Sequence, residues 1–150
     1  MKVCIGGTFN ILHKGHRLLI NKAFETAGKK GTVFIGITKG EMLKDKLVKK
    51  SFNERVESIK KYLLSKGYEK QAIIKAIHNK YGPTLEGDFD AIIVSPGTVE
   101  TANEINTKRE KKGLKPLNIV KIPYLMAEDN KPISSTRILN KEIDKEGKMI

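Results

Sequence analysis

The sequence has few of the residues that mark several common protein classes. It has one cysteine, Cys4, so an internal disulfide is excluded and a small buried core residue is expected. It has no tryptophan, and aromatic residues make up only 6% of the chain, so stacking platforms for single-stranded nucleic acid are scarce. No apolar run approaches the roughly 20 residues that cross a bilayer, and no signal-peptide pattern is present. We therefore expect a cytoplasmic protein without a membrane partner.

Length and composition favour one globular domain over residues 1–150. With 150 residues, of which 39% are hydrophobic and 31% charged, the chain is long enough to bury one ordinary core. The net charge of +12 admits nucleic acid or small polyanions as partners. Only four of the 29 basic residues are arginines, whose planar fork matches phosphate better than an ammonium group does. Arg109 and Arg137 are therefore candidates for phosphate binding.

Apolar, β-branched segments alternate with helical patterns along the whole chain. One helix starts with a capping box, Ser51 with Glu54, and extends to Gly67. Because strands that alternate with helices form parallel sheets, we predict an α/β, Rossmann-like fold: a five-stranded parallel sheet with helices on both faces. The predicted strands are 3–5, 32–38, 72–77, 90–95 and 117–122, and the other predicted helices are 15–26 and 99–112.

The segment Gly6–His16 lies between the first predicted strand and the first predicted helix. A glycine-rich turn at this place presents backbone N–H groups and the positive end of a helix dipole, an arrangement that binds phosphate. Two of the three histidines, His13 and His16, fall in this segment, close enough in sequence to face the same anion. The pattern predicts a nucleotide as the ligand.

A second polar segment, Ser134–Arg137, stands at the start of a predicted helix near the C-terminus. One hydroxyl would be enough to cap a helix, but three occur in a row. Arg137 follows them in the first turn, where the helix dipole disfavours a cation unless an anion is bound. We interpret this segment as the second half of a phosphate site.

These two motifs resemble those of the nucleotidyltransferases that carry a His-x-Gly-His signature. The first is Thr8-Phe9 followed by His13–His16, and the second is Ile133–Arg137. Within that superfamily, the stretch 91–117 looks most like the archaeal type of phosphopantetheine adenylyltransferase. The residues that carry this second likeness are Ser95, Thr98, Ile105, Asn106, Arg109 and Gly113-Leu114-Lys115-Pro116-Leu117.

The resemblance implies transfer of AMP from ATP to 4′-phosphopantetheine, which gives dephospho-coenzyme A and pyrophosphate. On this model His16, Thr8 and Lys46 are the catalytic residues: His16 donates to the α-phosphate, and Thr8 places the attacking phosphate. The segment Ser134–Arg137 would bind the β- and γ-phosphates. The implied ATP-binding residues are Gly7, Thr8, Phe9, His13, Gly15, His16, Ser134, Ser135, Thr136 and Arg137.

For the phosphate of the acceptor, the resemblance offers Thr8, Lys46 and Arg109, with Lys44 as a weaker candidate. Mg²⁺ is expected to arrive on the phosphates of ATP, without a metal site built from side chains. The alternative within the enzyme class is another acceptor: flavin mononucleotide, nicotinamide mononucleotide, or glycerol 3-phosphate with CTP. A basic nucleic-acid-binding module is less favoured, because no basic face is evident from the sequence. A homo-oligomer is left open.

Overall fold

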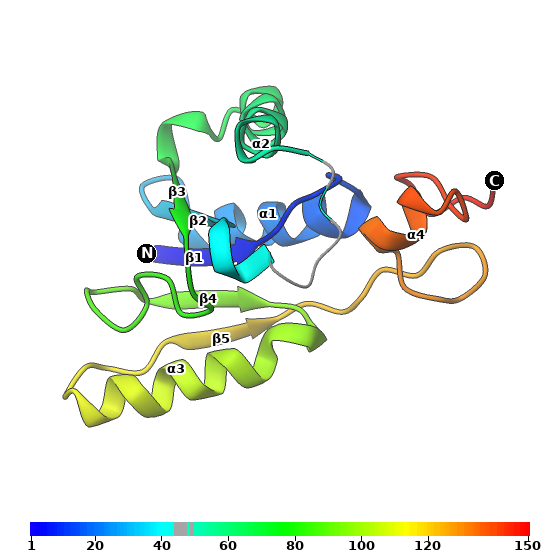
Figure 1. Ribbon diagram of the computed structural model, residues 1–150. Coiled ribbons are helices and arrows are strands. Elements are labelled where there is room, and N and C mark those ends of the chain that lie inside the picture. Colours follow the sequence, from blue (N-terminus) through cyan, green and yellow to red (C-terminus); the bar gives the residue numbers. More distant parts are fainter. Residues whose placement is uncertain (44–47, 49) are drawn as a thin grey trace.

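Five parallel strands form one sheet in the computed structural model, which describes residues 1–43, 48 and 50–150. The sheet order is β3-β2-β1-β4-β5, and every neighbouring pair is parallel (Figure 1). The prediction of a five-stranded parallel sheet is confirmed. The strands are β1 (Lys2–Gly7), β2 (Thr32–Thr38), β3 (Ala72–Ile77), β4 (Ala91–Val94) and β5 (Asn118–Lys121).

Helices cover both faces of the sheet. Helices α1 (Lys14–Ala27) and α2 (Phe52–Lys66) lie on one face, whereas α3 (Val99–Lys111) lies on the other, as Figure 1 shows. The strands bury alternate residues against these two layers. Val3 and Ile5 of β1 pack in the core with α1 and α2, whereas Cys4 packs with Ile105 of α3. This two-sided burial explains the nearly continuous apolar runs of the strands.

The helix boundaries follow from local capping chemistry. Ser51 accepts from the Glu54 N–H at 3.1 Å, and the Glu54 carboxylate accepts from the Ser51 N–H at 3.2 Å, so the predicted capping box is present. Helix α2 ends at Gly67, which adopts a left-handed conformation with φ of 73°. Such a C-cap favours glycine, because other residues pay a steric cost there.

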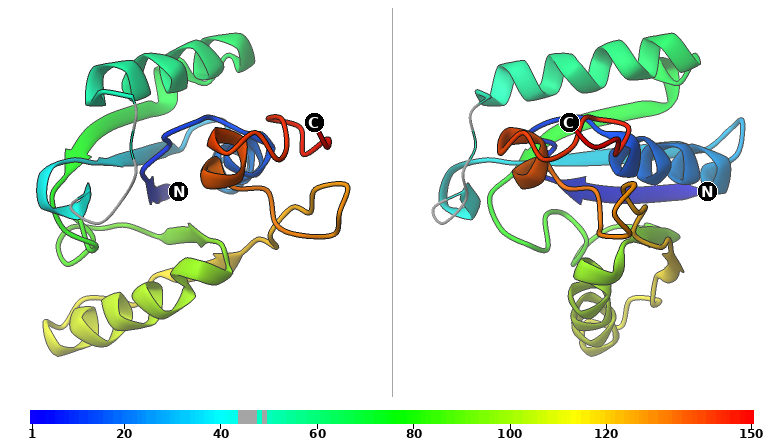
Figure 2. Two further views of the ribbon diagram at one scale, coloured as in Figure 1. Left: turned by 45° about the vertical axis from the view of Figure 1, so that its right-hand side comes forward. Right: turned by 90° about the vertical axis from the view of Figure 1, so that its right-hand side faces the viewer.

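The order of the sheet reverses between β1 and β4. Strand β1 pairs with β2 over its whole length but with β4 only at Val3 and Cys4, so β1 and β4 separate toward their carboxyl ends. A reversal of this kind opens a crevice where α/β proteins place ligands. The C-terminal segment returns to the same edge, where the short helix α4 (Ser135–Leu139) lies close to the start of α1 (Figure 2).

A short 3-10 turn, Gly40–Leu43, follows β2. The predicted acceptor-binding residues Lys44 and Lys46 lie outside the described residues. Within residues 1–43, 48 and 50–150, no helix combines the length and the apolar character needed to cross a membrane.

Candidate active site

A cavity of about 630 Å³ opens at the carboxyl edge of the sheet, between β1, α1 and α4. Ile11 and Ser135 join its two walls: the Ser135 hydroxyl lies 3.4 Å from both the amide nitrogen and the carbonyl oxygen of Ile11. The two motifs predicted from opposite ends of the chain therefore meet in space. The lining residues are Thr8, Phe9, Asn10, His13, Gly15, His16, Leu19, Val48, Ser95, Ile122, Pro123, Tyr124, Leu125, Ile133, Ser134, Ser135 and Thr136.

His13 and His16 form a stacked pair at the start of α1. His13 caps the helix: its Nδ1 accepts from the Gly15 N–H at 3.0 Å, and His16 Nδ1 accepts from the His13 N–H at 3.3 Å. The two rings lie with centroids 3.8 Å apart and planes inclined by 20°. Because Nδ1 of each ring is an acceptor, each neutral ring carries its proton on Nε2. The pair therefore offers two N–H donors at fixed positions.

Both imidazoles are neutral at physiological pH. Burial lowers the pKa of His13 from 6.5 to about 4, and the nearby Arg17 charge acts in the same direction. Burial also lowers the pKa of His16 from 6.5 to about 3, assisted by the neighbouring His13. A polyphosphate in the cavity would raise both values, because an anion favours the charged imidazolium. The neutral pair is thus set to donate hydrogen bonds rather than to accept protons.

The opposite wall carries the hydroxyl groups of Ser134, Ser135 and Thr136. Ser134 is the N-cap of α4, and its hydroxyl accepts from the Arg137 N–H at 3.3 Å. The Ser135 hydroxyl contacts Ile11, as described above. The capping explanation of this segment is therefore correct for Ser134, while Thr136 lines the cavity without a capping role.

Thr8 stands where β1 leaves the sheet and enters the site loop. Its hydroxyl lies 3.1 Å from the Thr38 hydroxyl at the end of β2. Phe9 follows with φ of 51°, an uncommon conformation for a residue other than glycine, and its ring contacts that of His16 with centroids 5.1 Å apart. The side chain of Phe9 is buried. Thr8 is thus held between the end of β2 and the cavity of about 630 Å³, which is called the nucleotide cavity below because the sequence predicts a nucleotide as its ligand.

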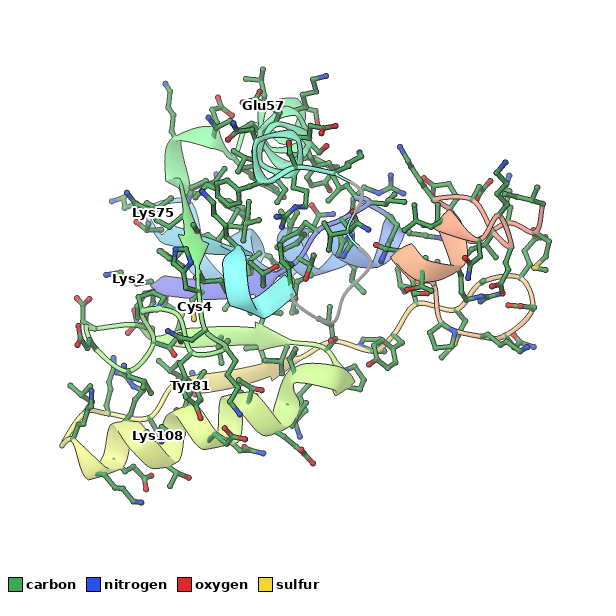
Figure 3. All side chains as sticks on the ribbon, in the orientation of Figure 1. Lys2, Cys4, Glu57, Lys75, Tyr81 and Lys108 are labelled. Carbon is green, nitrogen blue, oxygen red and sulfur yellow. The ribbon has the colours of Figure 1, made fainter. Side chains whose placement is uncertain are left out.

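A second, mostly apolar cavity of about 170 Å³ lies on the α3 face, behind Gly6 and Gly7. Its floor is the sheet at Cys4, Gly6 and Gly36, and its walls come from α3 and the loop that begins after β3. Tyr81 of this loop lies between the sheet and α3, with the Lys108 ammonium 5.4 Å from its ring centroid (Figure 3). The two cavities adjoin the same strand end, on either side of Gly7 and Thr8.

Comparison with known proteins agrees with this geometry. The model of the cytidylyltransferase-like family matches residues 4–141. A phosphopantetheine adenylyltransferase of Methanosarcina mazei is 50% identical over 149 residues, 99% of this chain and 96% of that protein. One of Archaeoglobus fulgidus is 46% identical over the full length of both chains. This chain belongs to the phosphopantetheine adenylyltransferase family. The family resemblance drawn from the two motifs and from residues 91–117 is therefore confirmed.

A solved structure supports the fold of this family member. A protein described as of unknown function from Archaeoglobus fulgidus superposes with a TM-score of 0.73 at 40% sequence identity. The match covers 81% of this chain and 89% of the other. The Rossmann-like architecture is thus shared by the two proteins.

The structure brings together most of the ATP-binding residues expected for this family. Gly7 lines the second cavity instead, so its contact with ATP stays a prediction. Arg137 is not among the residues that line the nucleotide cavity either. Its guanidinium forms ion pairs with Asp129 and Glu142 and donates to the carbonyls of Lys131 and Pro132. Binding of the β- and γ-phosphates by Arg137 stays a prediction, which requires the guanidinium to exchange partners.

Arg109 is not brought to the site. It is 1% exposed and donates to backbone carbonyls, at 2.8 Å to Lys115, 2.9 Å to Thr84, 3.4 Å to Glu86 and 3.3 Å to Gly87. These carbonyls belong to the segment 84–87 and to Lys115, and Arg109 lines neither cavity, which argues against its predicted role at the acceptor phosphate. Its planar fork matches several carbonyls at once, which explains an arginine here without a phosphate ligand.

Sequence reasoning missed the apolar cavity and the buried Arg55. The available signal for the cavity was Gly36, a glycine inside an otherwise β-branched strand, which often marks a place where another group approaches the backbone. A Cβ built on Gly36 would lie 2.8 Å from Cγ2 of Ile77. The signal for Arg55 was the rarity of arginine among the basic residues, four of 29.

Proposed function

We propose that this protein transfers AMP from ATP to the phosphate of 4′-phosphopantetheine, a step of coenzyme A biosynthesis. The products are dephospho-coenzyme A and pyrophosphate. One observation carries the proposal: His13 and His16 from one end of the chain share a cavity with Ser134, Ser135 and Thr136 from the other. The names of the full-length relatives, phosphopantetheine adenylyltransferases, support the same acceptor.

The chemistry of the transfer suits neutral histidine donors. An oxygen of the acceptor phosphate forms a bond to the α-phosphorus, and the bond from that phosphorus to the oxygen bridging to the β-phosphate breaks. The attacking oxygen is already anionic, so no side chain has to remove a proton. Catalysis is then mainly positioning and stabilisation of charge. His16 would donate its Nε2–H to the α-phosphate as charge develops, and His13, stacked beside it, would donate to a neighbouring phosphate oxygen.

The apolar cavity offers a place for the acceptor's pantetheine arm. This arm is uncharged, and the cavity is lined largely by apolar side chains, among them Ile77, Ile92 and Ile105. An acceptor lying there would bring its phosphate to Thr8, where the two cavities approach each other. That placement puts the attacking phosphate and the α-phosphate of ATP on adjacent sides of the same loop. This placement supports direct transfer of AMP between two substrates bound side by side.

Mg²⁺ fits this site as a partner of the ATP phosphates. Within the described part of the chain, no group of three or more histidine, cysteine or carboxylate side chains is arranged to hold a metal. The polar side chains that the cavity offers, such as Thr8, Asn10 and Ser135, carry neutral oxygen atoms. Mg²⁺ commonly keeps several waters and binds through substrate phosphates, which agrees with such a donor set. When bound, it would neutralise part of the charge on the phosphates.

The test is a pyrophosphate-release assay with ATP, Mg²⁺ and a panel of acceptors. The panel contains 4′-phosphopantetheine, flavin mononucleotide, nicotinamide mononucleotide and, with CTP in place of ATP, glycerol 3-phosphate. We expect turnover with 4′-phosphopantetheine and formation of dephospho-coenzyme A, identified by its mass. Turnover restricted to another acceptor would reject the proposed substrate while leaving the reaction class in place.

A further inference from the structure

Arg55 is a buried cation directly behind the loop that carries Thr8. It stands in the first turn of α2 and is 1% exposed. Its guanidinium donates to three backbone carbonyls: Nη1 to Thr8 at 2.9 Å and to Thr38 at 2.8 Å, and Nε to Lys50 at 3.3 Å. None of these partners is a carboxylate. A buried charge compensated in this way by carbonyl dipoles depends on the positions of all three.

The three carbonyls belong to segments that come from different parts of the chain. Thr8 follows β1, Thr38 ends β2, and Lys50 precedes the cap of α2. The Thr8 and Thr38 hydroxyls are also within 3.1 Å of each other. One side chain thus connects the ends of two central strands with the start of a helix. Only the guanidinium of the Arg55 side chain can donate these hydrogen bonds, because the rest of the side chain is aliphatic.

The contact with Thr8 determines the direction of the next amide. In a planar trans peptide, the C=O and N–H groups point in opposite directions. Since the Thr8 carbonyl points at Arg55, the Phe9 N–H points away from it. Thr8 and Phe9 both line the nucleotide cavity, whereas Arg55 does not. Among the described residues, none accepts a hydrogen bond from the Phe9 N–H.

The backbone conformation of Phe9 needs support from the surrounding residues. Its φ of 51° lies in the left-handed region, which a residue other than glycine occupies only when its surroundings hold it there. The buried ring of Phe9, packed in the main core, fixes one side of the turn. The hydrogen bond from Arg55 to the preceding carbonyl fixes the other side.

We propose that Arg55 is a positioning residue for nucleotidyl transfer. It holds the Thr8–Phe9 peptide so that the Phe9 N–H donates to a phosphate oxygen of ATP and the Thr8 hydroxyl faces the acceptor. This inference rests on the proposed function for the reaction that it supports. Arg55 touches neither substrate, so its effect passes through the backbone.

Lysine cannot replace Arg55 in this role. A lysine side chain keeps the positive charge but ends about one bond short of the position of Nη1, so its ammonium does not reach both strand-end carbonyls. In Arg55→Lys the loop would lose its fixed orientation. Displacements of about 1 Å around reacting groups can cost roughly 100-fold in rate.

The first test compares Arg55→Lys with Leu63→Ala by steady-state pyrophosphate release. Leu63 lies in the same helix two turns later, is 1% exposed and packs in the core, so its truncation destabilises α2 without touching the loop. Both variants are assayed below their melting temperatures. We expect kcat of Arg55→Lys to fall by about 10- to 100-fold with both KM values within about threefold, and kcat of Leu63→Ala to stay within about twofold of wild type. Equal kcat losses in the two variants, or none in Arg55→Lys, would overturn the proposal.

The second test needs no turnover. The amide proton of Phe9 is followed by NMR while ATP and Mg²⁺ are added. In the wild type we expect a downfield shift that marks a new hydrogen bond, and in Arg55→Lys we expect this shift to be lost; if that variant does not fold, Arg55→Gln takes its place. If the chemical shift of the Phe9 amide proton in the wild type does not change when ATP and Mg²⁺ are added, the inference is rejected. Because this titration uses no acceptor, it stays decisive even if 4′-phosphopantetheine proves not to be the substrate.

Discussion

Acidification from pH 7 to pH 5 is expected to destabilise the protein through His13 and His16. Their pKa values are lowered by burial, from 6.5 to about 4 and about 3. Between those values and the ordinary pKa, the unfolded chain binds more protons than the folded one, so the free energy of unfolding falls as the pH falls. For each histidine, linkage gives a loss of about 2 kcal/mol at pH 5 relative to pH 7.

The assay is urea unfolding, followed by circular dichroism at pH 7, 6 and 5. The matched variant is His16→Asn, whose side-chain oxygen can still accept from the His13 N–H but does not titrate. We expect this variant to lose about half of the pH dependence, roughly 2 kcal/mol at pH 5. His78→Gln, which changes an exposed histidine outside the site, is the control and should behave as wild type. Carboxylates contribute mainly below this range, because their ordinary pKa values lie near 4. An unchanged pH dependence in His16→Asn would refute the reasoning.

Three substitutions test the assigned roles by steady-state kinetics. His16→Ala removes a donor that acts on the transition state, so kcat should fall by roughly 10²- to 10³-fold with little change in ATP binding; a large loss of ATP affinity with kcat intact would contradict this role. Gly6→Ala places a methyl group in the apolar cavity at ordinary contact distance, 3.5 Å from Ile77, so KM for 4′-phosphopantetheine should rise roughly tenfold while KM for ATP stays constant. An unchanged KM for 4′-phosphopantetheine would show that its pantetheine arm does not bind in that cavity. Arg137→Ala should raise KM for ATP and lower the melting temperature, because it also breaks ion pairs with Asp129 and Glu142; loss of stability alone would assign Arg137 a structural role.

The strands and helices were predictable because local signals agreed with the tertiary structure. The β-branched run 32–38 and the Ser51 capping box each match their structural elements, and the sheet is parallel throughout, as the alternation of strands and helices predicts. The meeting of His16 with Ser135 in one cavity was also predictable, since both segments carry phosphate-binding features.

The roles of the arginines were less predictable, because an arginine fork binds backbone carbonyls as well as phosphate. Arg109 was expected at the acceptor phosphate, yet it donates to backbone carbonyls of the segment 84–87 and of Lys115. Arg55 was not among the predicted site residues, although its guanidinium donates to the Thr8 carbonyl. Which carbonyls an arginine meets depends on loop conformation, which residue spacing does not specify.

The choice of acceptor is tested most directly by a competition experiment. The protein is incubated with ATP, CTP, Mg²⁺ and equal concentrations of 4′-phosphopantetheine, flavin mononucleotide, nicotinamide mononucleotide and glycerol 3-phosphate. The products are then separated, and each is identified and quantified by mass spectrometry. The proposed function predicts dephospho-coenzyme A as the dominant product, with its formation lost in His16→Ala. A dominant adenine dinucleotide, made from flavin mononucleotide or nicotinamide mononucleotide, would contradict the proposed function. So would a dominant CDP-glycerol, made from glycerol 3-phosphate and CTP.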